Sequence, residues 1–152
     1  MVAPLSHFMA LALAEAEAGA QAGEVPVGAL IVKDGIALAA AQNRVERDRD
    51  PTAHAEILAI RAACSKMGEA RLAGAELIVT LEPCAMCAQA IAFARIAKLV
   101  FAAYDPKGGG VDHGARIFDR ASCHHHPEVI GGLMETEASA RLRAFFAGLR
   151  KG

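Results

Sequence analysis

Two short stretches of the chain carry residues whose types and spacing could hold a metal ion. Residues 52–56 read Thr-Ala-His-Ala-Glu, and residues 80–87 read Thr-Leu-Glu-Pro-Cys-Ala-Met-Cys. One imidazole and two thiolates suit Zn2+, and three protein ligands leave the fourth tetrahedral position open for water. His54, Cys84 and Cys87 therefore predict a catalytic zinc site, because a closed structural site would need a fourth protein ligand.

Glu56 supplies the proton carrier that such a site needs. It follows His54 by two residues and is not required as a ligand. A carboxylate beside metal-activated water can take a proton from the water and return it to a leaving group. The motif therefore predicts hydrolytic chemistry. The competing interpretation is a structural zinc site in which Glu56 is only a first-turn carboxylate favoured by the helix dipole.

The composition fits one folded domain. The chain has 152 residues, of which 54% are apolar and 22% are charged, so we expect residues 1–152 to form a single domain with its own core. Sixteen Lys and Arg residues against 17 Asp and Glu residues give a formal net charge of -1. This balance excludes a bulk basic bias toward nucleic acid and leaves a local basic patch open.

The sequence shows no sign of export or of a membrane anchor. The first residues lack the basic start and continuous apolar core of a secretory signal, and no apolar run approaches the length of a membrane span. Four cysteines, two of them in the metal motif, do not form a disulfide framework. We therefore expect a cytoplasmic protein with reduced thiols, in which Cys64 is a small core residue.

The elements ahead of the first motif are predicted from hydrophobic periodicity. Residues 6–18 form an amphipathic helix that Gly19 and Gly23 end. The apolar runs 25–32 and 36–41 are joined by Asp-Gly, which is a strong signal for a β-hairpin. The sheet is therefore expected to open with an antiparallel pair of strands.

Each metal motif is expected at the start of a helix. Residues 43–50 read as a loop, Asp-Pro at 50–51 starts a helix that runs to about residue 67, and Glu-Pro at 82–83 starts another that runs to about residue 94. Cys84 and Cys87 then share one side of a first turn. His54 and Glu56, two residues apart, do not share a helix face, so both can serve one site only if the cavity wraps the helix end.

Two further strands complete the pattern. Residues 76–81 form a near-continuous apolar run, as expected for a strand that is covered on both faces, and residues 98–102 form the next strand. Strands that alternate with helices through short connections predict an α/β sandwich with a parallel portion. Both helix starts would meet at one end of this sheet, where such folds bind their ligands.

The two motifs together resemble the signature of the cytidine deaminase superfamily. Within it, the chain is most similar to the bacterial tRNA adenosine deaminases. The likeness runs from the N-terminal helix through residues 24–29 and Asn43-Arg44 to Phe145-Phe146, and so covers most of the chain. It implies a cytidine deaminase-like α/β fold, namely a three-layer α/β/α sandwich around a mixed sheet of about five strands. It also implies a homodimer with one Zn2+ per subunit.

The resemblance also implies a reaction and a set of roles. Zinc-activated hydroxide would attack C6 of the wobble adenosine in a tRNA anticodon stem-loop and convert it to inosine, with Glu56 as proton shuttle. His54, Cys84 and Cys87 would bind the zinc. Substrate contacts would come from Asn43, which would hydrogen-bond the flipped nucleoside, from Val27 and Leu81 in the pocket walls, from Asp105 near the RNA backbone, and from Ala55.

The metal motif alone leaves other substrates open. Free-cytidine deaminases usually carry Cys where this chain has His54, and the deaminase of riboflavin biosynthesis spaces its cysteines further apart than Cys84 and Cys87. Deaminases of a free nucleobase or nucleoside, of the guanine, cytosine or adenine type, are the first alternative because members of that class share both motifs. A zinc-stapled binding module without catalysis is the second.

The C-terminal third departs most from this pattern. Three consecutive glycines at 108–110 predict a loop that is mobile or whose backbone approaches another group closely. Residues 123–126 read Cys-His-His-His, and we interpret this cluster as a polar loop, with a second metal site as the alternative. The last helix has an apolar face, formed by Leu142, Phe145, Phe146 and Leu149, that should anchor it to the core or to a partner. Its basic residues form either a solvated face or a phosphate-contacting tail, and they are Arg141, Arg143, Arg150 and Lys151.

Overall fold

The structure, a computed structural model, describes residues 3–151 and, within them, the side chains up to residue 149. The strands are β1 (Gly28–Lys33), β2 (Ile36–Gln42), β3 (Glu76–Leu81), β4 (Lys98–Ala103) and β5 (Glu128–Gly131). The helices are α1 (Leu5–Gln21), α2 (Val45–Asp48), α3 (Ala55–Met67), α4 (Ala85–Phe93) and α5 (Glu135–Lys151), with a 3-10 turn η1 (Ile117–Asp119).

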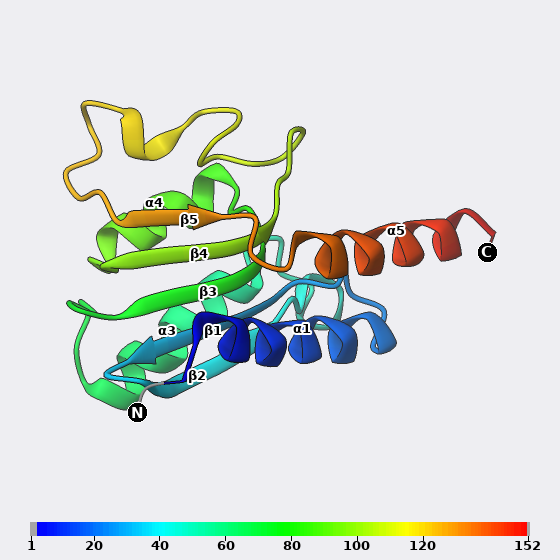
Figure 1. The fold of residues 1–152 in the computed structure, drawn as a ribbon, viewed down its shortest axis with the longest axis horizontal. Helices are drawn as coiled ribbons and strands as arrows, with labels where there is room; N and C mark the ends of the chain where they lie inside the picture. The colour runs from blue at the N-terminus through cyan, green and yellow to red at the C-terminus, as the bar shows by residue number, and fades with distance from the viewer. Residues whose placement is uncertain (1–2, 152) are drawn as a thin grey trace.

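A mixed sheet in the order β2-β1-β3-β4-β5 forms the middle layer (Figure 1). β1 is antiparallel to both β2 and β3, whereas β3, β4 and β5 are parallel. Helices α1 and α5 cover one face, and α3 and α4 cover the other. The predicted three-layer α/β/α sandwich with a mixed sheet of about five strands is therefore confirmed.

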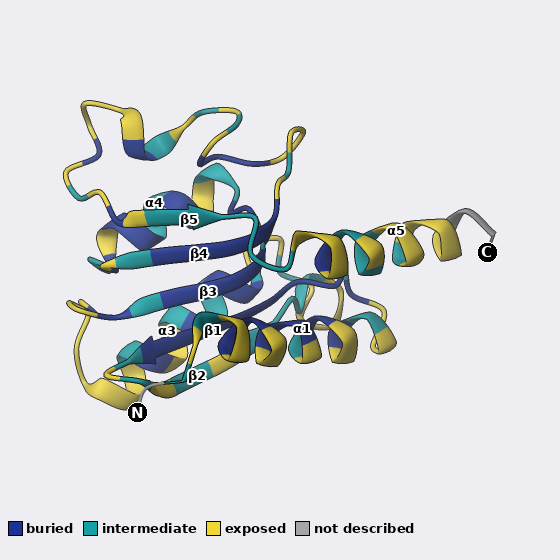
Figure 2. Ribbon diagram, in the orientation of Figure 1, coloured by how far each residue is buried: buried dark blue, intermediate teal, exposed yellow. Residues whose placement is uncertain are grey.

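The middle strands are buried because both of their faces are covered. Alternate residues of β1 point to opposite faces, so Ile31 packs toward α3 and α4 while Leu30 packs toward α1. In β3, Leu77, Ile78 and Val79 are all fully enclosed, which explains the near-continuous apolar run. Figure 2 shows this burial along the central strands and the exposure of the last turns of α5.

The first helix extends beyond its predicted end. Gly19 lies inside α1 and does not end it. The helix ends instead at Ala22 and Gly23, whose φ of 89° places it in the left-handed region. The amide of Glu24 then donates a hydrogen bond of 2.9 Å to the Gly19 carbonyl, which closes the helix terminus.

Both motif helices begin later than predicted. The Asp50 carboxylate accepts hydrogen bonds from the amide and hydroxyl of Thr52, at 2.8 and 2.7 Å, and so caps its own turn instead of a helix. α3 starts after His54 and α4 after Cys84, and both residues have extended backbone at the N-cap position. The predicted 43–50 loop also contains the short helix α2.

Helix α5 only partly fulfils the prediction of an anchored apolar face. Leu142 packs against the core on the α1 side of the sheet, but Phe146 and Leu149 are 42% and 61% exposed. The side chains of Arg150 and Lys151 lie outside the described residues. Among residues 3–151, no helix combines the length and the apolar character that a membrane crossing requires.

Candidate active site

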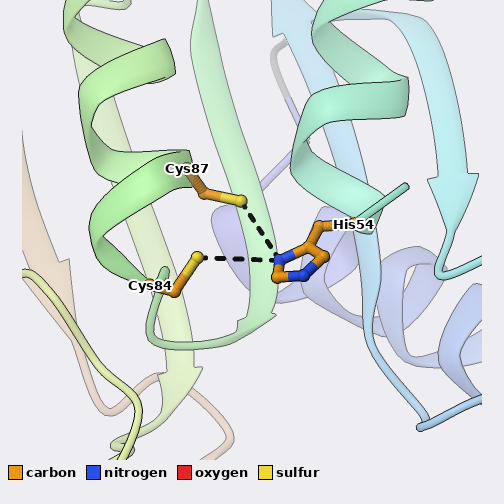
Figure 3. A group of neighbouring side chains, drawn as sticks. All are labelled: His54, Cys84 and Cys87. Atoms are coloured by element: carbon orange, nitrogen blue, oxygen red, sulfur yellow. Dashed lines mark hydrogen bonds between the residues drawn. The ribbon is translucent and has the colours of Figure 1, made fainter. Parts of the chain in front are cut away.

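The three predicted metal ligands converge in space. His54 Nδ1 lies 3.6 Å from the Cys84 sulfur and 3.5 Å from the Cys87 sulfur (Figure 3). The histidine reaches across from the N-cap of α3 to the two sulfurs at the start of α4. In the part of the chain that the structure describes, this is the one group of His, Cys, Asp or Glu side chains with converging ligand atoms.

The spacing of the donor atoms fits Zn2+. Tetrahedral coordination with Zn–S bonds of about 2.3 Å and Zn–N bonds of about 2.0–2.1 Å places sulfur and nitrogen about 3.5–3.6 Å apart. The two measured separations, 3.6 and 3.5 Å, agree with this geometry. The residues present can therefore hold the ion with little rearrangement.

The pKa values of the two cysteine thiols are shifted in opposite directions. A hydrogen bond from Cys87, together with one from His54, lowers the pKa of Cys84 to about 4 despite its partial burial. The same hydrogen bond and burial raise the pKa of Cys87. Both sulfurs lie at a helix N-terminus, where free amide groups and the helix dipole favour anionic sulfur. A divalent cation between them would stabilise two thiolates at once.

Glu56 is a buried carboxylate with a raised pKa beside the cluster. Its side chain is buried, and burial raises its pKa to about 7. A group with a pKa near the working pH can both accept and release a proton. Glu56 and His54 line the same cavity, so the cavity does wrap the start of α3, as their spacing of two residues required.

The cavity beside the cluster has a volume of about 520 Å3. Four of the predicted substrate residues line it, namely Val27, Asn43, Leu81 and Asp105. Ala55 does not: its side chain is fully buried, and its amide donates a hydrogen bond of 2.9 Å to Asn43 Oδ1. The Asn43 side chain also donates a hydrogen bond of 3.3 Å to the Val25 carbonyl, so it is fixed between the segment ahead of β1 and the start of α3.

Several cavity residues carry no sequence signal of their own. Glu24 and Glu82 line the cavity as buried carboxylates, although nothing in the sequence separates them from surface acids. Phe145 and Leu149 line it from α5, where their spacing had predicted only an anchoring face. The apolar periodicity of the last helix was the one signal that could have found them.

Glu24 fixes the short helix α2 at the rim of this cavity. Its carboxylate accepts hydrogen bonds from the amides of Glu46 and Arg47, at 3.1 and 2.9 Å, and from Arg47 Nε at 3.1 Å. Burial alone would raise the pKa of Glu24, but these hydrogen bonds and the positive charge of Arg47 hold it below its ordinary value of 4.5. The ionised carboxylate therefore stabilises the fold.

Glu24→Gln should lower the free energy of unfolding by about 1–3 kcal/mol at pH 7. The NH2 group of the glutamine would face the N–H donors of Glu46 and Arg47 and could not accept their hydrogen bonds. The pKa of Glu24 is lower in the folded than in the unfolded chain. Its contribution is thus present above pH 4.5 and is lost as the pH falls through the folded-state pKa. Urea denaturation at several pH values measures both effects.

The matched control for Glu24→Gln is Glu69→Gln, at an exposed position on the surface. The control should match the wild type at every pH. A gap between Glu24→Gln and the wild type that stays constant below pH 4.5 would contradict the role assigned to the ionised carboxylate.

The Cys-His-His-His cluster is held by hydrogen bonds within its own loop and to a neighbouring one. His125 Nε2 lies 2.6 Å from the Ile96 carbonyl, and the Cys123 thiol donates to the His125 carbonyl at 3.3 Å. Its ligand atoms do not converge as a metal group among the residues described. The alternative of a second metal site at residues 123–126 is therefore not supported.

Fold and site together define a zinc-dependent hydrolase of the deaminase class. A family model described as the cytidine and deoxycytidylate deaminase zinc-binding region matches residues 3–103, and the chain belongs to this family. The tRNA-specific adenosine deaminase of Agrobacterium fabrum is 52% identical over 95% of both chains. That of Bacillus subtilis is 44% identical over 95% of this chain and 89% of its own length.

Solved structures show the same relationship. A protein from a study of A-to-I editing by tRNA:A34 deaminases at the wobble position is 53% identical. It superposes with a TM-score of 0.88 over 90% of this chain and 99% of its own. A guanine deaminase from Nitrosomonas europaea is 28% identical, with a TM-score of 0.83 over 97% of this chain and 86% of its own. The fold is thus shared by deaminases that act on different purines.

Proposed function

We propose that this chain deaminates adenosine to inosine at the wobble position of a tRNA anticodon. The observation that carries the proposal is the cavity in which His54 and Cys84, two members of the converging ligand group, meet Glu56 and Asn43. The choice of substrate is supported by relatives named tRNA-specific adenosine deaminases, which match nearly the whole chain at up to 52% identity.

His54, Cys84 and Cys87 would hold Zn2+, which, when bound, lowers the pKa of water and makes it a nucleophile near neutral pH. Glu56 takes the proton that the water loses and delivers it to the purine ring nitrogen next to C6. It then assists the departure of the amino group as ammonia. The net reaction consumes water and adenosine and yields inosine and ammonia. A Glu56 pKa of about 7 suits this two-way transfer.

The remaining cavity residues position the nucleoside. A base inside a stacked anticodon loop must be turned out before its amino group can reach a buried site. Val27 and Leu81 offer apolar walls for the purine, and the fixed Asn43 amide offers hydrogen bonds to it. Asp105, which lines the same cavity, would lie near the RNA backbone. A volume of about 520 Å3 is in the range of small-molecule sites.

The proposal extends to the assembly. One zinc per subunit is supported by the single converging ligand group among the described residues. We further propose a cytoplasmic homodimer formed by residues 1–152 as a single deaminase domain. The side chain of Phe93, 69% exposed beside Ile57 and Ile60 on the outer surface of α3 and α4, supports a second copy there. Sedimentation equilibrium of the zinc-loaded chain tests whether it forms a dimer.

The decisive assay compares substrates directly. Zinc-loaded protein should form inosine in a synthetic anticodon stem-loop with a wobble adenosine and should leave free adenosine, adenine, cytosine and guanine unchanged. Turnover should fall steeply as salt rises, because counterion release makes binding to a phosphate backbone salt-dependent. The guanine deaminase neighbour makes a free-base enzyme the second candidate. Turnover of a free base, insensitive to salt and without turnover of the stem-loop, would establish that candidate instead.

A further inference from the structure

The buried carboxylate of Glu82 is the attachment point of one loop, residues 105–113. The side chain is fully enclosed, and all of the donors to its two oxygens among the described residues come from this loop. Oε1 accepts from the Asp105 amide at 3.0 Å and from His113 Nδ1 at 2.8 Å. Oε2 accepts from three consecutive amides, those of Val111, Asp112 and His113, at 3.2, 3.0 and 3.1 Å.

The same loop lies against the start of the metal-binding helix. The amide of Gly110 donates to the Pro83 carbonyl at 2.8 Å, and a side chain at Gly110 would lie 2.5 Å from the Ala85 amide nitrogen. This contact confirms the close backbone approach that the three glycines at 108–110 predicted. The loop is therefore folded around Glu82 and packed onto the first turn of α4.

One part of this loop forms a wall of the candidate active-site cavity. Asp105 and Gly108 line that cavity together with Asn43 and Glu56. The Gly108 amide donates to Asp105 Oδ1 at 2.9 Å, and the Gly109 amide donates to the Asp105 carbonyl at 2.8 Å. The position of Asp105 at the cavity thus depends on the hydrogen bonds that hold the rest of the loop.

His113 is the loop side chain that completes the attachment. Its ring is about one-third exposed, at 35%, and packs edge-on against Tyr104, which in turn packs edge-on against Phe101 in the core. A hydrogen bond to an ionised carboxylate is among the stronger ones in proteins. Removal of the ring would therefore loosen the loop while the enclosed Glu82 carboxylate keeps its amide donors.

We propose that Glu82 and His113 are positioning residues that hold the 105–113 loop in the shape that binds substrate. They act through the loop, which forms a wall of the cavity, and not on the reacting atoms. The affinity for RNA therefore depends on them, whereas the chemical step at Glu56 does not. The identity of the ligand as an anticodon stem-loop rests on the proposed function.

The test uses full-length zinc-loaded protein and the variant His113→Ala. The KM for the stem-loop should rise about tenfold, as expected when one charge-assisted hydrogen bond no longer holds the loop, while kcat stays within about twofold. The Kd for the product stem-loop, which carries inosine at the wobble position, should rise by the same factor in fluorescence anisotropy. His113→Gln should restore most of the affinity, because its amide group can donate to Glu82.

The matched control is His124→Ala, which removes an exposed imidazole elsewhere and should leave KM, kcat and Kd at their wild-type values. An unchanged KM for His113→Ala, or a fall confined to kcat, would overturn the positioning role while the wild type still deaminates the stem-loop. Failure of the wild type itself to deaminate the stem-loop would overturn the proposed function. The two failures are therefore distinguishable in one series of measurements.

Discussion

Glu56→Gln is expected to lower turnover of the anticodon stem-loop by about 100- to 10,000-fold, because a positioned proton carrier contributes about that much to catalysis. The fold and the zinc content should not change. The amide has nearly the shape of the carboxylate and no required role as a ligand, since the His54, Cys84 and Cys87 donors converge without it. Because the side chain of Glu56 is buried, a carboxylate on the protein surface cannot easily take over its proton transfer.

Single-turnover kinetics with excess enzyme measure this loss without interference from product release. The control is Glu69→Gln, which alters an exposed carboxylate away from the cavity and should retain wild-type rates. A Glu56→Gln variant with wild-type turnover would mean that another group carries the proton. A zinc-stapled binding module predicts a different pattern, namely no turnover by the wild type and unchanged partner binding by Glu56→Gln.

The candidate metal ligands could be found from the sequence because the signal of the two cysteines is local. Cys84 and Cys87 are three residues apart at the start of a helix, so their side chains must share one side of it. β3 was predicted with its observed bounds because burial on both faces leaves a continuous apolar run. The start of α3 was predicted too early, because Asp50 can cap either a helix or its own turn. Only the tertiary setting decides between the two.

The burial of Glu24 and Glu82 could not be predicted from the sequence, because their hydrogen-bond donors are distant in the chain. Glu24 receives amides from residues that are 22 and 23 positions further along the chain. Glu82 receives its donors from residues that are 23 to 31 positions away. A carboxylate at such a position has the same local pattern as a solvated one. Its burial depends on the conformation of a distant loop, which hydrophobic periodicity does not predict.

Helix α5 shows a limit of periodicity itself. Residues at i, i+3, i+4 and i+7 share a face of a helix. Whether that face is buried or exposed to solvent depends on which other elements pack against it. Phe145 and Leu149 border the candidate active-site cavity, and Phe146 is 42% exposed. The pattern therefore found the face and could not show that it ends beside the cavity.

Cys87→Ala is expected to abolish both zinc retention and turnover. The variant leaves His54 and Cys84, and two protein ligands do not complete the three-ligand set of a catalytic zinc site. Cys87 is fully buried at the start of α4, so no other side chain of the first turn can replace its sulfur. Metal analysis after dialysis should find about one zinc per wild-type chain and almost none in the variant, whereas Cys64→Ala should match the wild type.

Thermal unfolding then separates a catalytic zinc from a structural one. Zinc that binds only the folded chain stabilises it by mass action, so a chelator should lower the melting temperature of the wild type and leave that of Cys87→Ala unchanged. The metal-free wild type should stay folded, because two apolar cores on opposite faces of the sheet hold it together without the cluster. Complete unfolding on zinc removal would instead favour a structural zinc, in which case the chain would need the ion for its fold before any chemistry.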